Sequence, residues 1–515
     1  MTGERDRAAP ELSARYVRRR DWARPLRVHL STVIVALLLG ISLPLTWLAH
    51  DQGTRLATSA ASERMSLLGR RVAAQYEAVF NDGLTAVMLA AAADTLLVVA
   101  CAAAAHAAPA AVGMLEAGAG DAGSCVSALA KAFAGAAAAA LGFLFTGFAF
   151  MFGNGSSGLV GAEGFFLSGT ADNAVSVALQ GFQYAGSFTA LADFPVPLAA
   201  KVLLFSAAAA LPGALAGAAL AGRGRLTAAA AFSFLAAGGA VGVVGHWAWG
   251  GGWLAGLGFV DFAGGAVVHM LGGMAALEAC RRAGPRSAPA PARDWHNAPL
   301  AAQGALALAA ALGAFHAGCT LALEPFPVAH VLLATYFSGS AGLLAALFAD
   351  SFWSDTGALS LPALLRGLLA GVVSVSACCP FVSIPSAVLV GSFGGLLATL
   401  LGHVVRDLGL DDPVGIVPAC LGCGTWSVLA VGLFAEGPGT IYGLGPAQGL
   451  LLGGSAAQLC TQAAGALAVG AFALLFSSLT WALLDRLIGL KSPGAGGRGG
   501  LDAAEHGRGA YDLPP

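Results

Sequence analysis

The chain has 515 residues, of which 57% are hydrophobic and only 10% are charged, and its mean hydropathy is +0.76. A soluble globular domain carries about 25% charged residues, so this composition excludes an ordinary soluble protein. The net charge of −2 gives no indication of a nucleic-acid partner. The nine cysteines are scattered, most of them in apolar runs where Cys behaves as a small hydrophobe, and we expect neither a disulfide framework nor a cofactor.

The N-terminal part predicts one membrane helix ahead of the main hydrophobic region. Residues 1–29 are basic, and an apolar run over 30–49 is long enough to span a bilayer. No clear small-x-small cleavage site follows, so we expect an uncleaved helix whose N-terminus lies in the cytoplasm. Residues 50–82 are polar and amphipathic, which predicts an extracytoplasmic helical spacer. An alternative is a short resemblance of residues 30–82 to the membrane helix and stalk of a bacterial sensor.

Further along the chain, a domain over residues 83–490 contains repeated apolar segments of membrane-spanning length. The richness in glycine and alanine fits helices that pack closely in lipid, where small residues let backbones approach. We predict eleven helices here, which makes twelve with the N-terminal one. They cover residues 84–107, 126–151, 197–220, 226–247, 262–280, 299–321, 327–348, 360–379, 385–404, 414–435 and 457–484.

Positive charge between these segments predicts their orientation. Lys and Arg gather after every other helix and are absent from the predicted outer loops. Because cytoplasmic loops carry an excess of Lys and Arg, twelve helices with both termini inside satisfy the pattern. We therefore expect a multi-pass protein of the bacterial inner membrane, with residues 491–515 as a cytoplasmic tail. The basic residues that set this orientation are Arg223, Arg225, those of 281–293, Arg406, Arg486 and Lys491.

Five short segments resemble the ammonium transporter (Amt/Rh) family, in its order and spacing. They are residues 113–118, 246–252, 261–269, 411–415 and 500–507. The resemblance implies a fold of eleven transmembrane helices, built as two inverted five-helix repeats plus a last helix. It also implies a homotrimer with a hydrophobic pore in each subunit, ammonium, ammonia or methylammonium as substrate, and a cytoplasmic tail that a regulatory protein can bind.

At the outer mouth, the resemblance assigns Trp249 and Asp261. An aromatic face attracts a cation, so Trp249 matches the family's recruiting aromatic, although an interfacial Trp anchor is the plainer interpretation. Asp261 opens a membrane helix. It is expected to act structurally, either fixing the outer site or serving as an N-cap, and the two roles are compatible.

At mid-membrane, the resemblance implies two stacked histidines, and this chain keeps one. His269 lies eight residues after Asp261 in an apolar stretch, where an ionisable side chain is functional by default. Cys420 stands where the second histidine is expected. A thiol is a poorer proton relay than an imidazole near neutral pH, so this substitution puts transport in question.

Other expected pore positions also depart from the family. Phe315 matches one gate phenylalanine, but His316 replaces an expected Asn, and Cys319 an expected Ser or Gly. We assign both of these as substrate-contacting candidates. Leu204 and Ala208 stand where the family has two aromatic residues, which would leave the outer gate half removed.

These features support three hypotheses. The first is ammonium transport. The second is an ammonium sensor or regulatory protein with a degenerate pore, and the third, weaker one is a conduit for a neutral gas such as CO2. No nucleophile–base pair, phosphate loop or metal set predicts an enzyme. The CxxC of Cys420 and Cys423 leaves a soft-metal or thiol site as an alternative, although the second pair of ligands is missing.

Overall fold

The computed structural model describes residues 83–155, 157–168, 187–192, 194, 196–286, 295–323, 325–353, 360–438, 445–493 and 500–511. The predicted N-terminal helix over 30–49 and the spacer over 50–82 lie outside these residues. The chain divides into two units, Met1–Met88 with Ser351–Ala358, and Leu89–Asp350 with Leu359–Pro515. The second unit holds the pore region and is described below.

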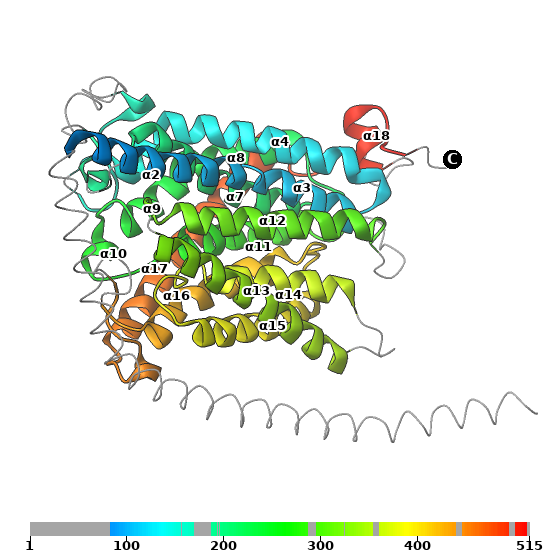
Figure 1. The fold of residues 1–515 in the computed structure, drawn as a ribbon. Helices are drawn as coiled ribbons and strands as arrows, with labels where there is room; N and C mark the ends of the chain where they lie inside the picture. Colours follow the sequence, from blue (N-terminus) through cyan, green and yellow to red (C-terminus); the bar gives the residue numbers. More distant parts are fainter. Residues whose placement is uncertain are drawn as a thin grey trace, which may run out of the picture. The chain divides into compact units, whose positions relative to one another are not determined.

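The described residues are helical, without a β-strand, and Gly224 and Lys491 form an isolated antiparallel bridge. The helices up to residue 283 are α2 (Gly83–Ala105), α3 (Ala108–Ala119), α4 (Cys125–Gly142), α5 (Phe148–Phe152), α7 (Leu198–Ala218), α8 (Leu226–Leu235), α9 (Val241–Ala248), α10 (Trp253–Gly256) and α11 (Leu271–Ala283) (Figure 1). The later helices are α12 (Ala298–Gly318), α13 (Pro325–Trp353), α14 (Leu361–Ser374), α15 (Ile384–Asp407), α16 (Cys423–Phe434), α17 (Ala457–Ile488) and α18 (Gly500–His506). Short 3-10 turns are η1 (Ala122–Ser124), η3 (Phe165–Leu167), η4 (Thr189–Leu191) and η8 (Leu450–Leu452).

All eleven apolar segments predicted in the described region contain helix. Judged by length and composition, nine helical stretches of the described residues suit a membrane crossing. The other two predicted segments correspond to α14, which has only 14 residues, and to α11 with the turn that precedes it. The first predicted segment was too short, because the helix restarts at Ala108 with Pro109 in its first turn and runs on to Ala119.

Four helical stretches are π-helix, in which each backbone N–H bonds the carbonyl five residues earlier, where an α-helix bonds the carbonyl four residues earlier. They are η2 (Phe143–Gly147), η5 (Ala236–Ala240), η6 (Gly265–Met270) and η7 (Val417–Gly422). Such π turns often occur at functional sites. Two of them, η6 and η7, carry His269 and Cys420, the residues expected at mid-membrane.

Small residues allow the helices of the pore region to pack closely. Figure 1 shows α3 beside α12, and these two helices are in contact. A Cβ atom added at Gly304 would lie 2.4 Å from the backbone nitrogen of Leu115, and one added at Gly118 would lie 2.3 Å from that of Ala301. Glycine at these positions therefore lets two backbones touch. The close approach brings Leu115 of α3 and Leu308 of α12 to the same pocket.

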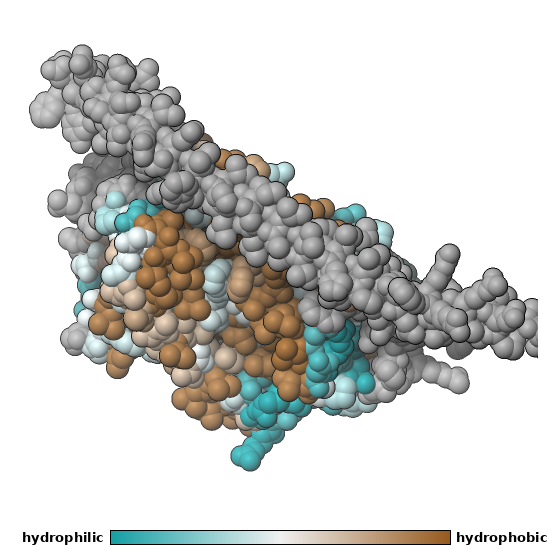
Figure 2. Space-filling model, turned by 90° about the horizontal axis from the view of Figure 1, so that it is seen from below, coloured by the Kyte–Doolittle hydropathy of each residue, from teal (hydrophilic) through white to brown (hydrophobic). Residues whose placement is uncertain are grey.

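Large apolar side chains are exposed on the surface of this unit. Leu96 is 70% exposed, Phe326 77% and Leu467 75%. Figure 2 shows a face on which hydrophobic residues predominate and polar residues gather in smaller groups. Contiguous apolar surface of this kind marks contact with a membrane or with other protein subunits. Together with the long apolar helices, it describes a multi-pass α-helical membrane protein.

Candidate functional site

Asp261 positions the helix that carries His269. Its carboxylate accepts hydrogen bonds from the backbone N–H groups of Gly265 (2.6 Å), Ala266 (2.9 Å) and Val267 (3.0 Å), and the side chain is only 3% exposed. These N–H groups begin the helix and would otherwise be orphaned inside the protein. Asp261 is thus bonded as a helix cap, and it determines where the first turn of η6 starts.

Asp412 repeats this arrangement in the second half of the chain. Its carboxylate accepts from the N–H groups of Gly415 (3.1 Å), Ile416 (3.1 Å) and Val417 (2.8 Å). Each aspartate precedes a π-wound turn, and each is followed eight residues later by a buried side chain, His269 or Cys420. Within this chain, Cys420 is therefore the structural counterpart of His269.

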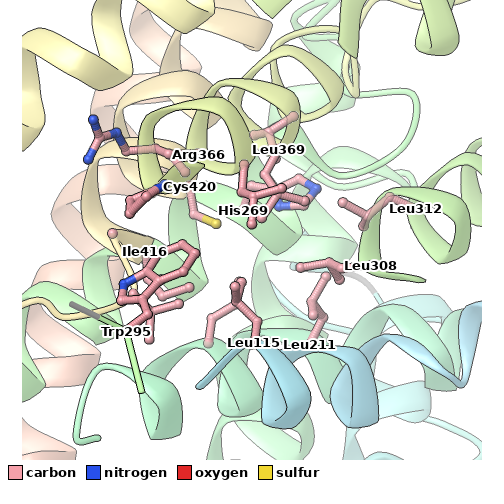
Figure 3. Close-up of a pocket in the computed structure, with 17 residues that line it drawn as sticks. Leu115, Leu211, His269, Trp295, Leu308, Leu312, Arg366, Leu369, Ile416 and Cys420 are labelled. Carbon is pink, nitrogen blue, oxygen red and sulfur yellow. The ribbon is translucent and has the colours of Figure 1, made fainter. Parts of the chain in front are cut away.

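His269 and Cys420 meet at one narrow pocket inside the helix bundle. Figure 3 shows the Cys420 thiol turned toward the imidazole of His269, among leucine side chains from several helices. His269 is 1% exposed, and its Nδ1 has no hydrogen-bond partner among the described residues. The pocket is lined by Leu115, Leu211, Leu215, His269, Trp295, Leu308, Leu312, Pro362, Leu365, Arg366, Leu369, Val373, Val414, Gly415, Ile416, Ala419 and Cys420.

Trp249 lies next to Asp261, as the sequence predicted. Its indole N–H donates to the backbone carbonyl of Asp261. Its ring contacts Phe205, with 5.6 Å between ring centroids, and Phe205 in turn packs on Phe152 at 4.7 Å. Sequence reasoning missed Phe205 because it searched for an aromatic at Leu204. The phenylalanine one residue further along the same predicted helix was the available signal.

Phe315, Leu204 and Ala208 are buried in a single apolar cluster that also contains Cys420. Their exposed fractions are 4%, 0% and 4%. None of the three lines the pocket of Figure 3, nor do Trp249 and Asp261. Phe315, Leu204 and Ala208 therefore pack in the apolar core around the pocket, but they do not line it.

His316 is completely buried, and both of its ring nitrogens have partners. Nδ1 lies 3.0 Å from the hydroxyl of Thr335, and Nε2 lies 3.1 Å from that of Ser376. Since the Thr335 hydroxyl donates to the carbonyl of Val331 (2.8 Å), its oxygen is left to accept from the imidazole. A substrate could bond this ring only by displacing one of these hydroxyls. The neighbouring Cys319, one turn on, is partly exposed.

The two thiols of the CxxC point to different places. Cys420 lines the pocket, whereas the Cys423 thiol contacts the carbonyl of Gly394 on α15 at 3.4 Å. Residues three apart share a face of an α-helix, but the turn that carries Cys420 is π-wound. Among the described residues, no three His, Cys, Asp or Glu side chains are grouped so that they could hold a metal ion.

Two residues of the pocket were missed by sequence reasoning. Arg366 of α14 and Trp295, just ahead of α12, both line the pocket. Figure 3 shows Trp295 beside Ile416 and Arg366 beside Cys420, with the guanidinium turned away from His269. The signal for Arg366 was available, because it is an ionised residue inside the predicted segment 360–379. Trp295 carried no comparable signal, since a tryptophan beside a membrane segment is common.

An ionic network joins three connecting segments, which carry Arg223, Arg286 and Asp411. Asp411 accepts from Arg286 through the backbone N–H (3.0 Å), Nε (3.0 Å) and Nη2 (3.2 Å). Arg223 Nη1 approaches the same carboxylate at 3.6 Å. Burial by itself would raise the pKa of Asp411, but the hydrogen bonds from Arg286 and the charge of Arg223 outweigh it, and the pKa is held below its ordinary value.

The C-terminal helix α18 is bound to the same part of the molecule. Asp502, which is buried, accepts from the backbone N–H groups of Val126 (3.0 Å) and Ser127 (2.8 Å) at the start of α4. Glu505 accepts from the N–H of Leu226 (3.1 Å) at the start of α8. The tail thereby caps two helices whose N-termini would otherwise be unsatisfied.

Comparisons with known proteins agree with this geometry. The sequence profile of the Ammonium Transporter Family matches residues 96–511. Ammonium transporter Amt2 of Archaeoglobus fulgidus is 30% identical over 415 residues, which cover 77% of this chain and 84% of that protein. A solved structure described as a sensor Amt protein has a TM-score of 0.69 at 25% identity, covering 81% of this chain and 99% of its own. The crystal structure of Candida albicans Mep2 has a TM-score of 0.68 at 24% identity, covering 77% and 84% of the two chains, and supports the fold alone. The chain therefore belongs to the Ammonium Transporter Family, and its helices form the ammonium transporter fold.

Proposed function

We propose that this chain moves ammonium or ammonia across a membrane through the pocket that holds His269 and Cys420. The observation that carries the proposal is a buried imidazole facing a narrow space walled by leucines. A bare cation in such surroundings costs several kcal/mol or more, so ions are disfavoured there. A small neutral amine can enter and hydrogen-bond the imidazole. The family, and relatives described as ammonium transporters, support the same function.

The site residues take separate roles in this proposal. Trp249 offers an aromatic face to the arriving cation, and Asp261 fixes that mouth by capping η6. His269 accepts or donates the hydrogen bond at mid-pore, with the Cys420 thiol as its weaker partner. We assign Phe315, Leu204 and Ala208 to the apolar gate region, as residues that exclude water. His316 and Cys319 remain candidates for contact with substrate, methylammonium included.

Proteoliposomes subjected to a sudden ammonium gradient test this function. Ammonia that enters takes up a proton and makes the lumen alkaline, which a trapped pH dye reports. The chain should speed this alkalinisation above that of empty vesicles, and His269→Ala should lower the protein-dependent part at least tenfold because the imidazole that hydrogen-bonds the amine is then lost. A rate equal to that of empty vesicles would refute the proposal.

We further propose that the protein assembles as a homotrimer, as the family resemblance implies. Light scattering of the detergent-solubilised protein, corrected for bound detergent, should give three times the mass of the 51.0 kDa chain. A mass of one or two chains would contradict this assembly. The exposed apolar surface of Figure 2 supports contact with lipid or with neighbouring subunits.

The orientation proposed from the sequence places both termini in the cytoplasm of a bacterial cell. In support, α18 contacts the starts of α4 and α8, which lie beside the loop of Arg223 and Arg225. On this proposal, residues 30–49 form the extra membrane helix, and the tail is open to a soluble regulatory protein. Protease added to inside-out vesicles should trim the tail, whereas protease added to intact spheroplasts should not. The reverse result would overturn the orientation.

A further inference from the structure

His316 joins three separate elements of the helix bundle. It belongs to α12 and is 0% exposed. Its Nδ1 lies 3.0 Å from the hydroxyl of Thr335 on α13, and its Nε2 lies 3.1 Å from the hydroxyl of Ser376, in the turn that follows α14. Breaking either buried bond would leave a polar group unsatisfied, so the imidazole holds these elements in register.

The contacts of the ring determine which nitrogen carries the proton. Because the Thr335 hydroxyl donates to the carbonyl of Val331 (2.8 Å), the imidazole donates to Thr335 from Nδ1. In the neutral ring Nε2 is then the acceptor, and the Ser376 hydroxyl donates to it. The carbonyl of Val372, the other acceptor near this hydroxyl, is further away at 3.4 Å. Ser376 is therefore bonded to α12 through His316.

The turn that contains Ser376 supports the segment beside Asp261. The backbone carbonyl of Ser376 accepts from the N–H of Ala263 (2.8 Å), and that of Ala377 accepts from the N–H of Phe262 (3.2 Å). These two N–H groups belong to the residues that directly follow Asp261 in the chain. The turn at 376–377 therefore helps to determine where Asp261 lies.

Asp261 extends this path of contacts to the aromatic residue of the outer mouth. Its backbone carbonyl accepts the indole N–H of Trp249. A path of bonded contacts thus runs from His316 through Ser376 to Trp249, although His316 does not line the pocket of Figure 3. The hydroxyl of Ser427 on α16 also supports the turn, by accepting from the N–H of Ala377 (2.7 Å). Loss of the His316 bond should therefore loosen the turn without releasing it.

We propose that His316 is a positioning residue of the outer mouth, which acts on Asp261 and Trp249 through Ser376. This inference rests on the proposed transport function and deepens it. On this inference the imidazole acts without touching the substrate, because it keeps the turn in place and the turn keeps the mouth in place. Supporting contacts of this kind hold a binding group within about 0.5 Å of its working position.

The test measures the initial rate of internal alkalinisation in proteoliposomes over a series of ammonium concentrations, with the rate of empty vesicles subtracted. His316→Ala should raise the half-saturating concentration roughly tenfold, because a misplacement of about 1 Å at a site is enough for changes of that order. Loss of folded protein would lower the maximal rate and leave the half-saturating concentration unchanged, so the two causes are separable.

Three further variants identify the bond that matters. Ser376→Ala removes only the hydroxyl that donates to His316, and it should give the same shift. Combined with His316→Ala it should add nothing, since both changes break one bond. His316→Gln, whose amide oxygen can accept from Ser376, should lie between the original protein and His316→Ala.

Ser374→Ala is the matched control. Ser374 is also buried, but its hydroxyl donates within α14 to the carbonyl of Ala370 (2.7 Å). The half-saturating concentration of this variant should equal that of the original protein. A shift as large as that of Ser376→Ala would overturn the inference, because any lost hydroxyl in this region would then have the same effect.

Each remaining outcome separates the inference from the function on which it rests. If the original protein gives no flux above empty vesicles, the transport function itself fails. If flux is present and Ser376→Ala keeps the original half-saturating concentration, the positioning role is wrong and transport stands. A shift in His316→Ala alone would then indicate direct contact with substrate. Ser376→Ala decides the matter even if His316→Ala fails to fold.

Discussion

At the scale of single residues, two aspartates with the same bonding place two chemically different groups. Asp261 and Asp412 each accept three backbone N–H groups at the start of a π-wound turn. The side chains eight residues on, His269 and Cys420, then arrive at one pocket. The scaffold of the pore is therefore duplicated within the chain. Cys420 replaces the second histidine that the family resemblance implies, but the backbone around Cys420 is capped in the same way as the backbone around His269.

The cap at Asp261 should be important for stability. Asp261→Ala leaves three buried N–H groups without their acceptor, and a buried donor left unsatisfied costs about 1–3 kcal/mol. We expect the thermal unfolding midpoint in detergent to fall clearly for Asp261→Ala and by less for Asp261→Asn, which keeps one acceptor oxygen. Asp407→Ala, at an exposed position, is the control. If Asp261→Ala melted like the control, the capping role would be ruled out.

The sequence predicts a site residue well when that residue lies close in the chain to other residues of the site. Trp249, Asp261 and His269 were found because they lie in two short motifs, residues 246–252 and 261–269, that follow each other closely in the chain. Arg366 and Trp295 reach the same pocket from segments more than 70 residues apart in sequence, and no local spacing reveals such a meeting. Counting along a helix also left the aromatic partner of Trp249 one residue away from its real place, at Phe205.

At the scale of elements, the apolar segments were predicted well and their ends less well. Hydrophobicity marks where a helix crosses lipid, but it does not mark where the hydrogen bonds of a helix begin. The helix expected from residue 262 starts at Gly265, because Asp261 accepts the first N–H groups. The helix expected to residue 379 ends at Ser374, and turns follow it. Hydropathy alone also gives no sign that η6 and η7 are π-wound.

The loop network at Asp411 predicts a dependence on pH. Because the pKa of Asp411 is lowered in the folded protein, its contribution to stability is present above the unfolded-state pKa of about 3.9 and is lost as pH falls through the folded pKa. Asp411→Asn should therefore lower the unfolding midpoint at pH 7, by an amount equivalent to about 1 kcal/mol for this partly exposed pair. The gap between the two proteins should close as the pH is taken below about 4.

The measurement is a series of thermal unfolding curves in detergent between pH 7 and pH 3. Asp407→Asn, which removes an exposed carboxylate on the same side, serves as the control. A gap between Asp411→Asn and the original protein that stays constant over the whole range would show that the charge of Asp411 is not what stabilises the loops.

At the scale of the whole molecule, composition alone predicted a membrane protein and the motif order predicted its family. Both predictions follow from properties spread over hundreds of residues, which a local error cannot overturn. Whether the pore works with one histidine at mid-membrane is a different matter, since it depends on a single side chain at position 420. We propose that the imidazole of His269 and the apolar wall suffice for ammonia to pass.

The most direct test of this claim is the rate of internal alkalinisation after an ammonium jump, for the original protein beside Cys420→His. We predict that the original protein exceeds empty vesicles, and that Cys420→His changes the rate without being required for it. A silent original protein beside an active Cys420→His variant would contradict the account. The pore would then be intact but disabled at one position, and ammonium sensing would become the better description of this protein.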